Sequence, residues 1–297
     1  MLTGKTLLIT GGSGFFGQAF AHHALQAGAK AVRIFSRGEA LQAAMQARMP
    51  SSRLRFLIGD VREIDRLRLA MRGVDYVIHA AALKRIESCA YNPDEAVATN
   101  VTGTQRVVRA ALDADIERLL LISTDKACLP ITHYGQTKAV AESTVLGANV
   151  YLGGPPRFSV VRYGNVANST GSVIPLWRQQ AARGDALTVT DVRCTRFWIS
   201  LEEAVRFVDW ALDQPGGKCY VPPMPSYKVL DLAFAVQQST RPVTVIGMRG
   251  IEKLHEDCIA AHETDVIGPA QPMNSGTNTH WLDVTDLQDR LAAIEGT

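Results

Sequence analysis

Residues 5–17, KTLLITGGSGFFG, join a short apolar run to a glycine-rich turn. The apolar part predicts a buried strand, and Gly11, Gly14 and Gly17 form a GxxGxxG pattern directly after it. Glycines let the backbone of such a turn approach a pyrophosphate, and the helix that follows offers free N–H groups and a positive dipole end. Because the pattern lies between a strand and a helix, it predicts a dinucleotide site rather than an ordinary tight turn.

Apolar runs that predict strands recur along the first half of the chain, and helical patterns separate them. The strands are expected at 5–10, 31–36, 54–60, 74–82, 118–123 and 158–165, and the helices at 20–28, 64–73 and 95–114. Strands that alternate with helices are joined by right-handed crossovers, so we predict a doubly wound, parallel α/β (Rossmann) sheet. The strands are continuous apolar runs, as expected where helices cover both faces.

The alternation weakens after about residue 166. LEEAVRFVDWAL (201–212) predicts an amphipathic helix, and KCYVPP (218–223) predicts a short strand that prolines end. The stretch 262–280 is rich in Gly, Pro, Asn and Thr, which indicates a loop.

These patterns predict two unequal parts. We expect a dinucleotide-binding domain at 1–166, to which 200–222 returns, and a smaller substrate-binding lobe formed mainly by 167–297. The lobe would lie over the carboxyl edge of the sheet, where open α/β sheets bind their ligands.

The composition indicates a well-packed protein without a strong charge. The chain has 297 residues, a formal net charge of +2 and 46% hydrophobic residues. The small net charge gives no argument for nucleic acid or an anionic membrane as a partner. No apolar run reaches the roughly 18 residues of a membrane span, and the N-terminus lacks the apolar region of a signal peptide.

The cysteines and histidines favour a cytoplasmic protein without a metal. None of the five cysteines lies in a CxxC pair and the odd number suits no closed disulfide framework, so we expect reduced thiols. HEDCIAAH (255–262) spaces its histidines seven apart, unlike the HExxH zinc pattern.

The end of the second predicted strand indicates which dinucleotide binds. NAD sites usually place an acidic residue there for the ribose 2′-hydroxyl, whereas this chain has Ser36 and Arg37 and no acid until Glu39. A hydroxyl and a guanidinium suit the 2′-phosphate of NADP, although a solvated surface arginine is the alternative. Asp60 follows the third strand and could meet the adenine or cap the next helix.

STDKACLPITHYGQTK (123–138) gathers several reactive groups after the fifth strand. Tyr134 and Lys138 are four residues apart and would share one face of a helix. A nearby ammonium and a cationic nicotinamide would lower the phenol pKa from its usual value of about 10. Tyr134 could then take a proton from a substrate hydroxyl while hydride leaves the same carbon, and Thr124 could hydrogen-bond that oxygen.

The glycine pattern, the strand-end threonine and YxxxK together resemble the extended short-chain dehydrogenase/reductase superfamily. The stretches FSRGE, GDVR, HAAALKRIESCAYNP, TNVTGTQ, STDKACLPITHYGQTK, RYGNV, TRFWISLEEAVRFV and EKLHE resemble the inverting UDP-N-acetylglucosamine 4,6-dehydratases of the PseB type. The likeness covers about residues 3–260 and resumes at 274–288.

The resemblance implies a reaction without net redox change. The sugar is oxidised at C4, loses its C5 proton and its C6 hydroxyl, receives hydride at C6 and is reprotonated at C5. It implies that Asp125 is the acid at the C6 oxygen and Lys126 the base at C5, since retaining relatives carry Asp-Glu at this pair. A base must lose its proton, so we expect burial and a nearby positive nicotinamide to lower the Lys126 pKa. A plain salt bridge is not expected, because adjacent residues at a strand end point to opposite sides.

The resemblance also implies contact residues. Those expected to bind NADP are Gly11, Ser13, Gly14, Phe15, Phe16, Gly17, Ser36, Arg37, Asp60, Val61, Ala80, Ala81, Ala82, Lys84, Tyr134 and Lys138. Those expected to bind the UDP-sugar are Lys84, Asn165, Arg196, Lys253 and His255. For Lys84 an ordinary loop lysine is the alternative, and for His255 a packed histidine of the lobe.

Some positions depart from the family pattern. Gly38 replaces the usual aspartate, and Leu41 stands where a second cation often holds the 2′-phosphate. The lobe is also shorter than is typical between EKLHE and the last helix. The leading prediction is an inverting dehydratase that begins a rare-sugar pathway such as that to pseudaminic acid, as a homo-oligomer. The alternatives are a retaining dehydratase or 4-epimerase acting on another nucleotide sugar, and a non-catalytic NADP-binding sensor.

Overall fold

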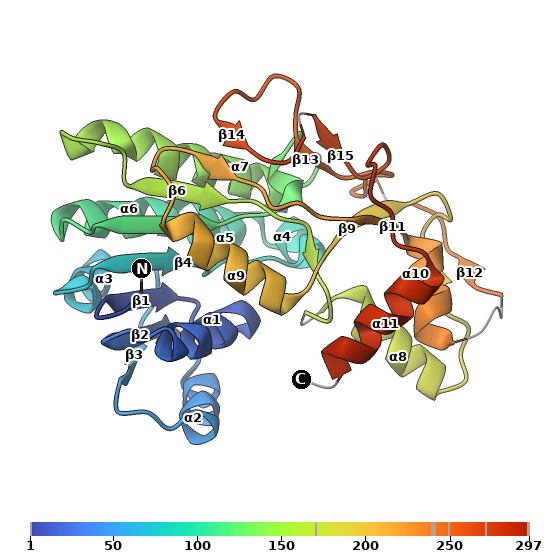
Figure 1. Cartoon of the computed structure of the whole chain (residues 1–297), viewed down its shortest axis with the longest axis horizontal. Helices are drawn as coiled ribbons and strands as arrows, with labels where there is room; N and C mark the ends of the chain where they lie inside the picture. Colours follow the sequence, from blue (N-terminus) through green and yellow to red (C-terminus); the bar gives the residue numbers. More distant parts are fainter. Residues whose placement is uncertain (1, 170, 239–241, 249, 271, 296–297) are drawn as a thin grey trace.

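A parallel sheet forms the centre of the protein (Figure 1). The computed structural model describes residues 2–295 except 170, 239–241, 249 and 271. Within that part, eight strands follow the order β14-β10-β6-β5-β4-β1-β2-β3, and every neighbouring pair is parallel. From β1 the chain adds β2 and β3 on one side and then β4 and β5 on the other, so the strand order reverses between β1 and β4, and this is the topological switch point at which such sheets bind ligands. The predicted doubly wound α/β fold is confirmed.

The sheet strands are short and apolar. They are β1 (Thr6–Thr10), β2 (Ala31–Ser36), β3 (Leu54–Ile58), β4 (Tyr76–His79), β5 (Arg118–Ile122), β6 (Phe158–Val161), β10 (Cys219–Tyr220) and β14 (Val266–Ile267). The helices of this part are α1 (Phe15–Gln26), α2 (Glu39–Arg48), α3 (Ile64–Met71), α4 (Ile86–Tyr91), α5 (Pro93–Ala96), α6 (Gly103–Asp113), α7 (His133–Gly147) and α9 (Leu201–Leu212). A π-helical segment, η1 (Val97–Thr102), lies between α5 and α6, and 3₁₀ turns form η2 (Asp125–Ala127) and η3 (Ala148–Leu152).

Helices cover both faces of the sheet because neighbouring strand residues point to opposite sides. Leu7 and Ile9 of β1 pack in one buried cluster with residues of α1 and α9, whereas Leu8 belongs to a second cluster with residues of α3, α6 and α7. This arrangement explains why the strands are apolar throughout.

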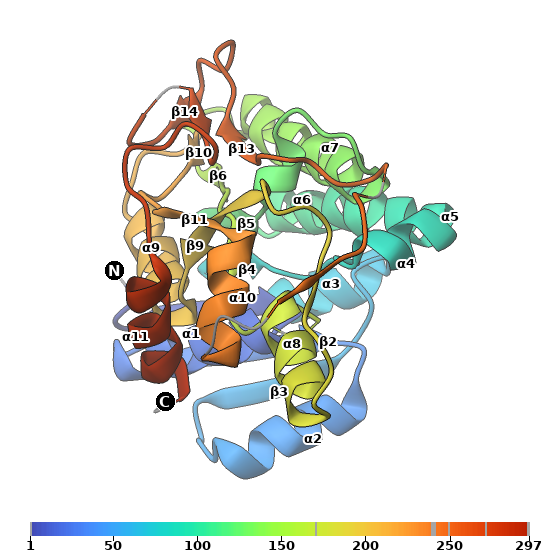
Figure 2. The ribbon, with the colours of Figure 1, turned by 90° about the vertical axis from the view of Figure 1, so that its right-hand side faces the viewer.

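A smaller lobe lies beyond the carboxyl ends of the strands (Figures 1 and 2). Its helices are α8 (Val173–Ala182), α10 (Val229–Gln237) and α11 (Val284–Glu295), and its strands are β7 (Asn165–Val166), β8 (Thr188–Val189), β9 (Thr195–Ile199), β11 (Ser226–Lys228), β12 (Thr244–Val245), β13 (Asp257–Ile259) and β15 (Met273–Asn274). A third buried cluster, which includes Trp177, Trp198 and Leu287, packs inside it. The boundaries predicted for the two domains stay a prediction.

Several predicted elements differ from the observed ones. The stretch 262–280 is not only a loop, because β14 pairs with β10 and extends the main sheet. The helix predicted at 95–114 is divided into α5, η1 and α6. The strand predicted at 158–165 ends at Val161, and Asn165 begins β7. Helices α2, α4, α8 and α10 were not predicted, and α1 begins at Phe15 rather than at residue 20.

Helix α7 approaches the turn after β5 closely at Gly135. A β-carbon at this position would overlap the carbonyl oxygen of Lys126 and lie 3.1 Å from its carbonyl carbon. The backbone N–H of Gly135 donates to the side chain of Thr132, which caps the helix. The small residue therefore allows η2 and the start of α7 to pack directly together.

We predict that Gly135→Ala lowers the free energy of unfolding by about 2 kcal/mol or more, because the new methyl group meets backbone that cannot rotate away. Gly147→Ala in the same helix is the matched control, because a β-carbon there meets nothing within 4 Å. The control should stabilise the protein by roughly 0.5 kcal/mol through helix propensity. Urea unfolding of both variants measures the difference, and equal stabilities would contradict the packing argument.

Candidate active site

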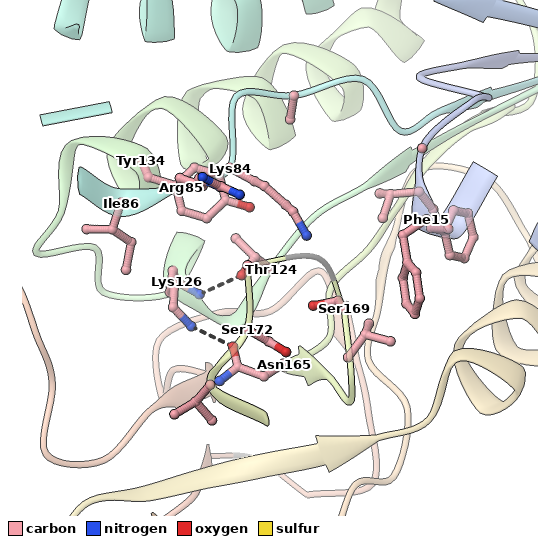
Figure 3. A pocket seen from close by; sticks show the side chains of 18 of the residues that line it. Phe15, Lys84, Arg85, Ile86, Thr124, Lys126, Tyr134, Asn165, Ser169 and Ser172 are labelled. Atoms are coloured by element: carbon pink, nitrogen blue, oxygen red, sulfur yellow. Dashed lines mark hydrogen bonds between the residues drawn. The ribbon is translucent and has the colours of Figure 1, made fainter. Parts of the chain in front are cut away.

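A cavity of about 1300 Å³ lies between the carboxyl edge of the sheet and the small lobe. Every residue expected to bind the dinucleotide lines it, from Gly11 to Lys138. In Figure 3, Lys84, Thr124, Lys126 and Asn165 point toward one another across this cavity, and Phe15 stands on another wall. The cavity therefore joins the glycine-rich turn to the polar segment after β5.

The glycine-rich turn allows neighbouring backbone segments to approach one another closely. Gly11 has φ +67°, and a β-carbon there would lie 2.8 Å from the backbone nitrogen of Ala81. A β-carbon at Gly17 would lie 2.6 Å from the Cα atom of Gly12. Gly14 is the N-cap of α1 and leaves the first N–H groups of the helix without a side-chain cap. An anionic group at this turn would meet those N–H groups and the positive end of the helix dipole.

The end of β2 presents hydroxyl and guanidinium groups to the cavity. The Oγ atoms of Ser13 and Ser36 are 2.8 Å apart. The side chain of Arg37 is 59% exposed, and its Nη1 atom lies 3.7 Å from a carboxylate oxygen of Asp60. Asp60 accepts hydrogen bonds from the backbone and the guanidinium of Arg62, so it does not cap a helix; the N-cap of α3 is Glu63.

Tyr134 and Lys138 share the buried face of α7, as predicted. Burial raises the pKa of the Tyr134 phenol to about 12, although the Lys126 cation and a hydrogen bond with Thr124 oppose the rise. Lys138 Nζ donates to the carbonyl oxygen of Ile122 at 2.8 Å, and burial lowers the pKa of this amine to about 8. In the free protein the phenol is therefore protonated near neutral pH.

Asp125 and Lys126 do not point to opposite sides, and that expectation was wrong. They lie in the 3₁₀ turn η2 rather than in a strand, so Lys126 Nζ reaches a carboxylate oxygen of Asp125 at 3.0 Å. The expected fall in the Lys126 pKa is also wrong for the free protein. Burial does lower the pKa, but the carboxylates of Asp125 and Glu256 outweigh it and raise the pKa above its usual value.

The two members of the pair differ in their access to the cavity. Lys126 lines it and donates to Asn165 Oδ1 at 3.1 Å. Asp125 is fully buried and is not part of the lining, and its Oδ2 atom has no hydrogen-bond partner. Its Oδ1 atom accepts from the Thr124 hydroxyl at 3.0 Å. Desolvation is the main reason why the pKa of Asp125 is raised.

The residues expected to bind the sugar nucleotide are placed differently. Lys84 faces the cavity, and its partial burial lowers the pKa of its amine. Arg196 and Lys253 line the cavity but have protein partners: Arg196 pairs with Glu252 at 3.2 Å, and Lys253 donates to the carbonyl oxygen of Cys128 at 2.8 Å. His255 does not line the cavity; its Nδ1 atom hydrogen-bonds the Thr195 hydroxyl, and its contacts are those of a packed histidine. These binding roles stay predictions.

Glu256 is a site residue that the sequence analysis did not single out. It is 3% exposed, lines the cavity and places a carboxylate oxygen 3.4 Å from Lys126 Nζ. The only signal in the sequence is that it ends the EKLHE stretch.

The comparisons place the chain among known proteins. A family model described as "Polysaccharide biosynthesis protein" matches residues 7–271. The chain belongs to this family. It is 42% identical over 268 residues to a UDP-N-acetylglucosamine 4,6-dehydratase (inverting) of Campylobacter jejuni, covering 89% of this chain and 80% of the relative. The resemblance to the inverting dehydratases is thus confirmed.

Two further similarities are informative. A UDP-glucose 4-epimerase of Rickettsia rickettsii is 40% identical over 272 residues, with 89% of this chain and 80% of that one covered. The X-ray structure of Pen from Bacillus thuringiensis has a TM-score of 0.89 at 32% identity and covers 98% of this chain and 99% of its own. The fold shared with Pen therefore extends through the small lobe, whereas the reactions named for the sequence relatives differ.

The described residues include neither a membrane-spanning helix nor a metal-binding cluster. No helix among them is long and apolar enough to cross a membrane. Nor do they contain a group of three or more histidine, cysteine, aspartate or glutamate side chains that could hold a metal ion.

We predict that Tyr134 of the free protein ionises only near pH 12, because burial disfavours the phenolate. The absorbance at 295 nm is followed during a pH titration of the wild type and of Tyr134→Phe, and the difference reports this residue. Tyr151→Phe, which removes a phenol that is 77% exposed, is the matched control for the loss of one tyrosine. Ionisation of Tyr134 below pH 9 in the free protein would contradict the account.

Proposed function

We propose that this protein is a nucleotide-sugar 4,6-dehydratase, a hydro-lyase, that acts on UDP-N-acetylglucosamine and inverts C5. The observation that carries the proposal is the placement of Thr124, Lys126 and Tyr134 on one cavity, next to a turn shaped for a pyrophosphate. Lys126 rather than a glutamate follows Asp125, which is the pattern of the inverting relatives. The relative from Campylobacter supports the same substrate and stereochemistry.

NADP fits the cavity in this proposal. The glycine turn and the N-terminus of α1 would hold its pyrophosphate, and Ser13, Ser36 and Arg37 would surround the 2′-phosphate. When bound, the oxidised nicotinamide supplies a reversible hydride acceptor. Gly38 and Leu41 add no charge here, so Arg37 is the principal cation toward the phosphate.

Tyr134 would take the proton of the C4 hydroxyl as C4 is oxidised. Its pKa must fall from about 12 for this role, and a cationic nicotinamide beside the phenol would lower it. Thr124 would hydrogen-bond the same oxygen. Lys138, which is buried on the same helix, would add a second positive charge when protonated.

Elimination needs an acid and a base at the same time. In the free protein, Asp125 and Lys126 hold between them one proton that either residue can carry. Transfer of that proton along the 3.0 Å hydrogen bond from Lys126 to Asp125 gives a neutral amine and a neutral carboxylic acid. Lys126 would then remove the C5 proton, which the C4 ketone has acidified, while the proton of Asp125 leaves with the C6 hydroxyl as water. Because Asp125 does not line the cavity, its proton would pass through the Thr124 hydroxyl, which bonds it directly.

A 4-epimerase is the second candidate, since relatives from Rickettsia carry that name. An epimerase needs the tyrosine and the dinucleotide but no acid and base at C5 and C6. The buried pair formed by Asp125 and Lys126 favours the dehydratase. We further infer a cytoplasmic homo-oligomer that supplies a rare-sugar pathway of the pseudaminic acid type, as the resemblance implies.

We predict that the protein, incubated with UDP-N-acetylglucosamine and NADP in D₂O, forms a product with a C6 methyl group, deuterium at C5 and inverted C5 configuration. Proton NMR detects all three changes. Lys126→Glu is the matched variant, because it creates the Asp-Glu pair of the retaining relatives. If Lys126→Glu still inverts C5 at the wild-type rate, Lys126 is not the base; a product epimerised at C4 without a methyl signal would favour the epimerase.

We predict that Arg37→Ala weakens NADP binding about ten-fold or more while NAD binding changes little, because an ion pair with the 2′-phosphate is lost. Isothermal titration calorimetry measures both affinities. Arg72→Ala, which removes an exposed arginine that is not part of the cavity lining, is the control for the change in net charge. Equal weakening of NADP and NAD would overturn the assignment of the phosphate site.

A further inference from the structure

Lys126 lies between two carboxylates that come from distant parts of the chain. Its Nζ atom is 3.0 Å from Asp125 Oδ1, 3.4 Å from Glu256 Oε1 and 3.1 Å from Asn165 Oδ1. The ammonium thus has three oxygen partners, which matches its three protons. The second oxygen of each carboxylate, Asp125 Oδ2 and Glu256 Oε2, is buried without a hydrogen-bond partner.

Glu256 is held firmly in this position. Its backbone N–H donates to the hydroxyl of Ser275, and its carbonyl oxygen accepts from the Ser275 N–H, both at 2.8 Å. Its side chain is 4% exposed, and Arg196 Nε lies 3.7 Å from the same oxygen that faces Lys126. Of the two carboxylates beside Lys126, Glu256 is the one that lines the cavity.

Burial of a carboxylate without a full set of hydrogen-bond partners costs free energy of folding unless an opposite charge compensates it. Asp125 alone could neutralise Lys126, so charge balance of the pair does not require Glu256. When Asp125 takes the shared proton, however, Glu256 is the remaining anion beside the amine. It would then stabilise the ammonium that forms as Lys126 takes a proton from carbon.

We propose that Glu256 is a positioning residue: its carboxylate fixes the Lys126 amine toward the cavity and makes this amine a stronger base than Asp125 alone would. The inference deepens the proposed function and rests on it, because it takes Lys126 to be the base at C5. The effect on Lys126 itself does not depend on any substrate.

The surroundings of Lys126 contain other charged or titratable groups. They are Asp125, Glu256, Arg196, Tyr134, Tyr227 and Lys253. Among them only Asp125 and Glu256 carry negative charge near neutral pH, and both raise the Lys126 pKa. Removal of the Glu256 charge should therefore lower the pKa of Lys126 and increase the fraction of neutral amine at a given pH.

Competitive acetylation with acetic anhydride tests this effect without substrate or cofactor. The rate at Lys126 is measured at pH 8 by mass spectrometry, relative to the exposed Lys30 of the same molecule. We expect Glu256→Gln to increase the relative rate at Lys126 at least about five-fold, because each unit of pKa changes the neutral fraction ten-fold and the weaker nucleophile offsets part of the gain.

Two matched variants distinguish the effect of the Glu256 charge on the Lys126 rate from an effect of a changed structure. Glu252→Gln removes a carboxylate that also pairs with Arg196 but makes no ion pair with Lys126, so it should leave the relative rate within two-fold of wild type. Glu256→Asp keeps the charge and should restore most of the wild-type rate. Circular dichroism and urea unfolding confirm that each variant is folded. A wild-type rate in Glu256→Gln, or an equal rise in Glu252→Gln, would overturn the proposal.

The pH dependence of turnover connects the residue to the reaction. In the proposed step the single proton of the Asp125–Lys126 pair is carried by Asp125, so turnover falls as the pH rises through the pKa at which the pair loses this proton. Without the negative charge of Glu256 that pKa is lower, so Glu256→Gln should move this falling limb to lower pH. If Glu256→Gln and the wild type show this limb at the same pH, Glu256 has no such role in the reaction. If the wild type forms no dehydrated product, the proposed function fails, while the acetylation rates still decide the effect of Glu256 on Lys126.

Discussion

An ammonium and two carboxylates meet at the carboxyl edge of the sheet, and the rest of the site is arranged around them. Burial of these charges is tolerated because Lys126 pairs with both Asp125 and Glu256. The turn after β5 brings Asp125 and Lys126 together, and the strand β13 region brings Glu256 from the small lobe. The interaction therefore ties the lobe to the sheet at the place where a substrate would bind.

The local features of this arrangement could be predicted from the sequence. The apolar runs predicted the strands because both faces of the sheet are covered, and GxxGxxG predicted a tight turn because only glycine fits beside Ala81 and Gly12. The spacing of Tyr134 and Lys138 predicted their shared helix face. Each of these depends on residues close together in the chain.

The features that depend on distant contacts could not be predicted in this way. The strand β14 has only two residues and exists because β10 offers a free edge. The position of Glu256 beside Lys126 follows from a contact between distant parts of the chain, and the Lys126 pKa rises rather than falls because the carboxylates of Asp125 and Glu256 together outweigh burial. The direction of Asp125 and Lys126 was mistaken because a strand was assumed where the chain forms a 3₁₀ turn. Relatives that are 40–42% identical to this chain are named dehydratases and epimerases, so the shared fold alone does not decide the reaction.

The most direct test of the central claim follows the hydrogen on C4 of the sugar. UDP-N-acetylglucosamine that carries deuterium at C4 is converted by the protein with NADP in ordinary water, and the product is examined by deuterium NMR and mass spectrometry. The account predicts that the label moves within the molecule from C4 to the C6 methyl group, because the site oxidises C4 and later reduces C6. A label that returns to C4, or no transfer with cofactor bound, would contradict it.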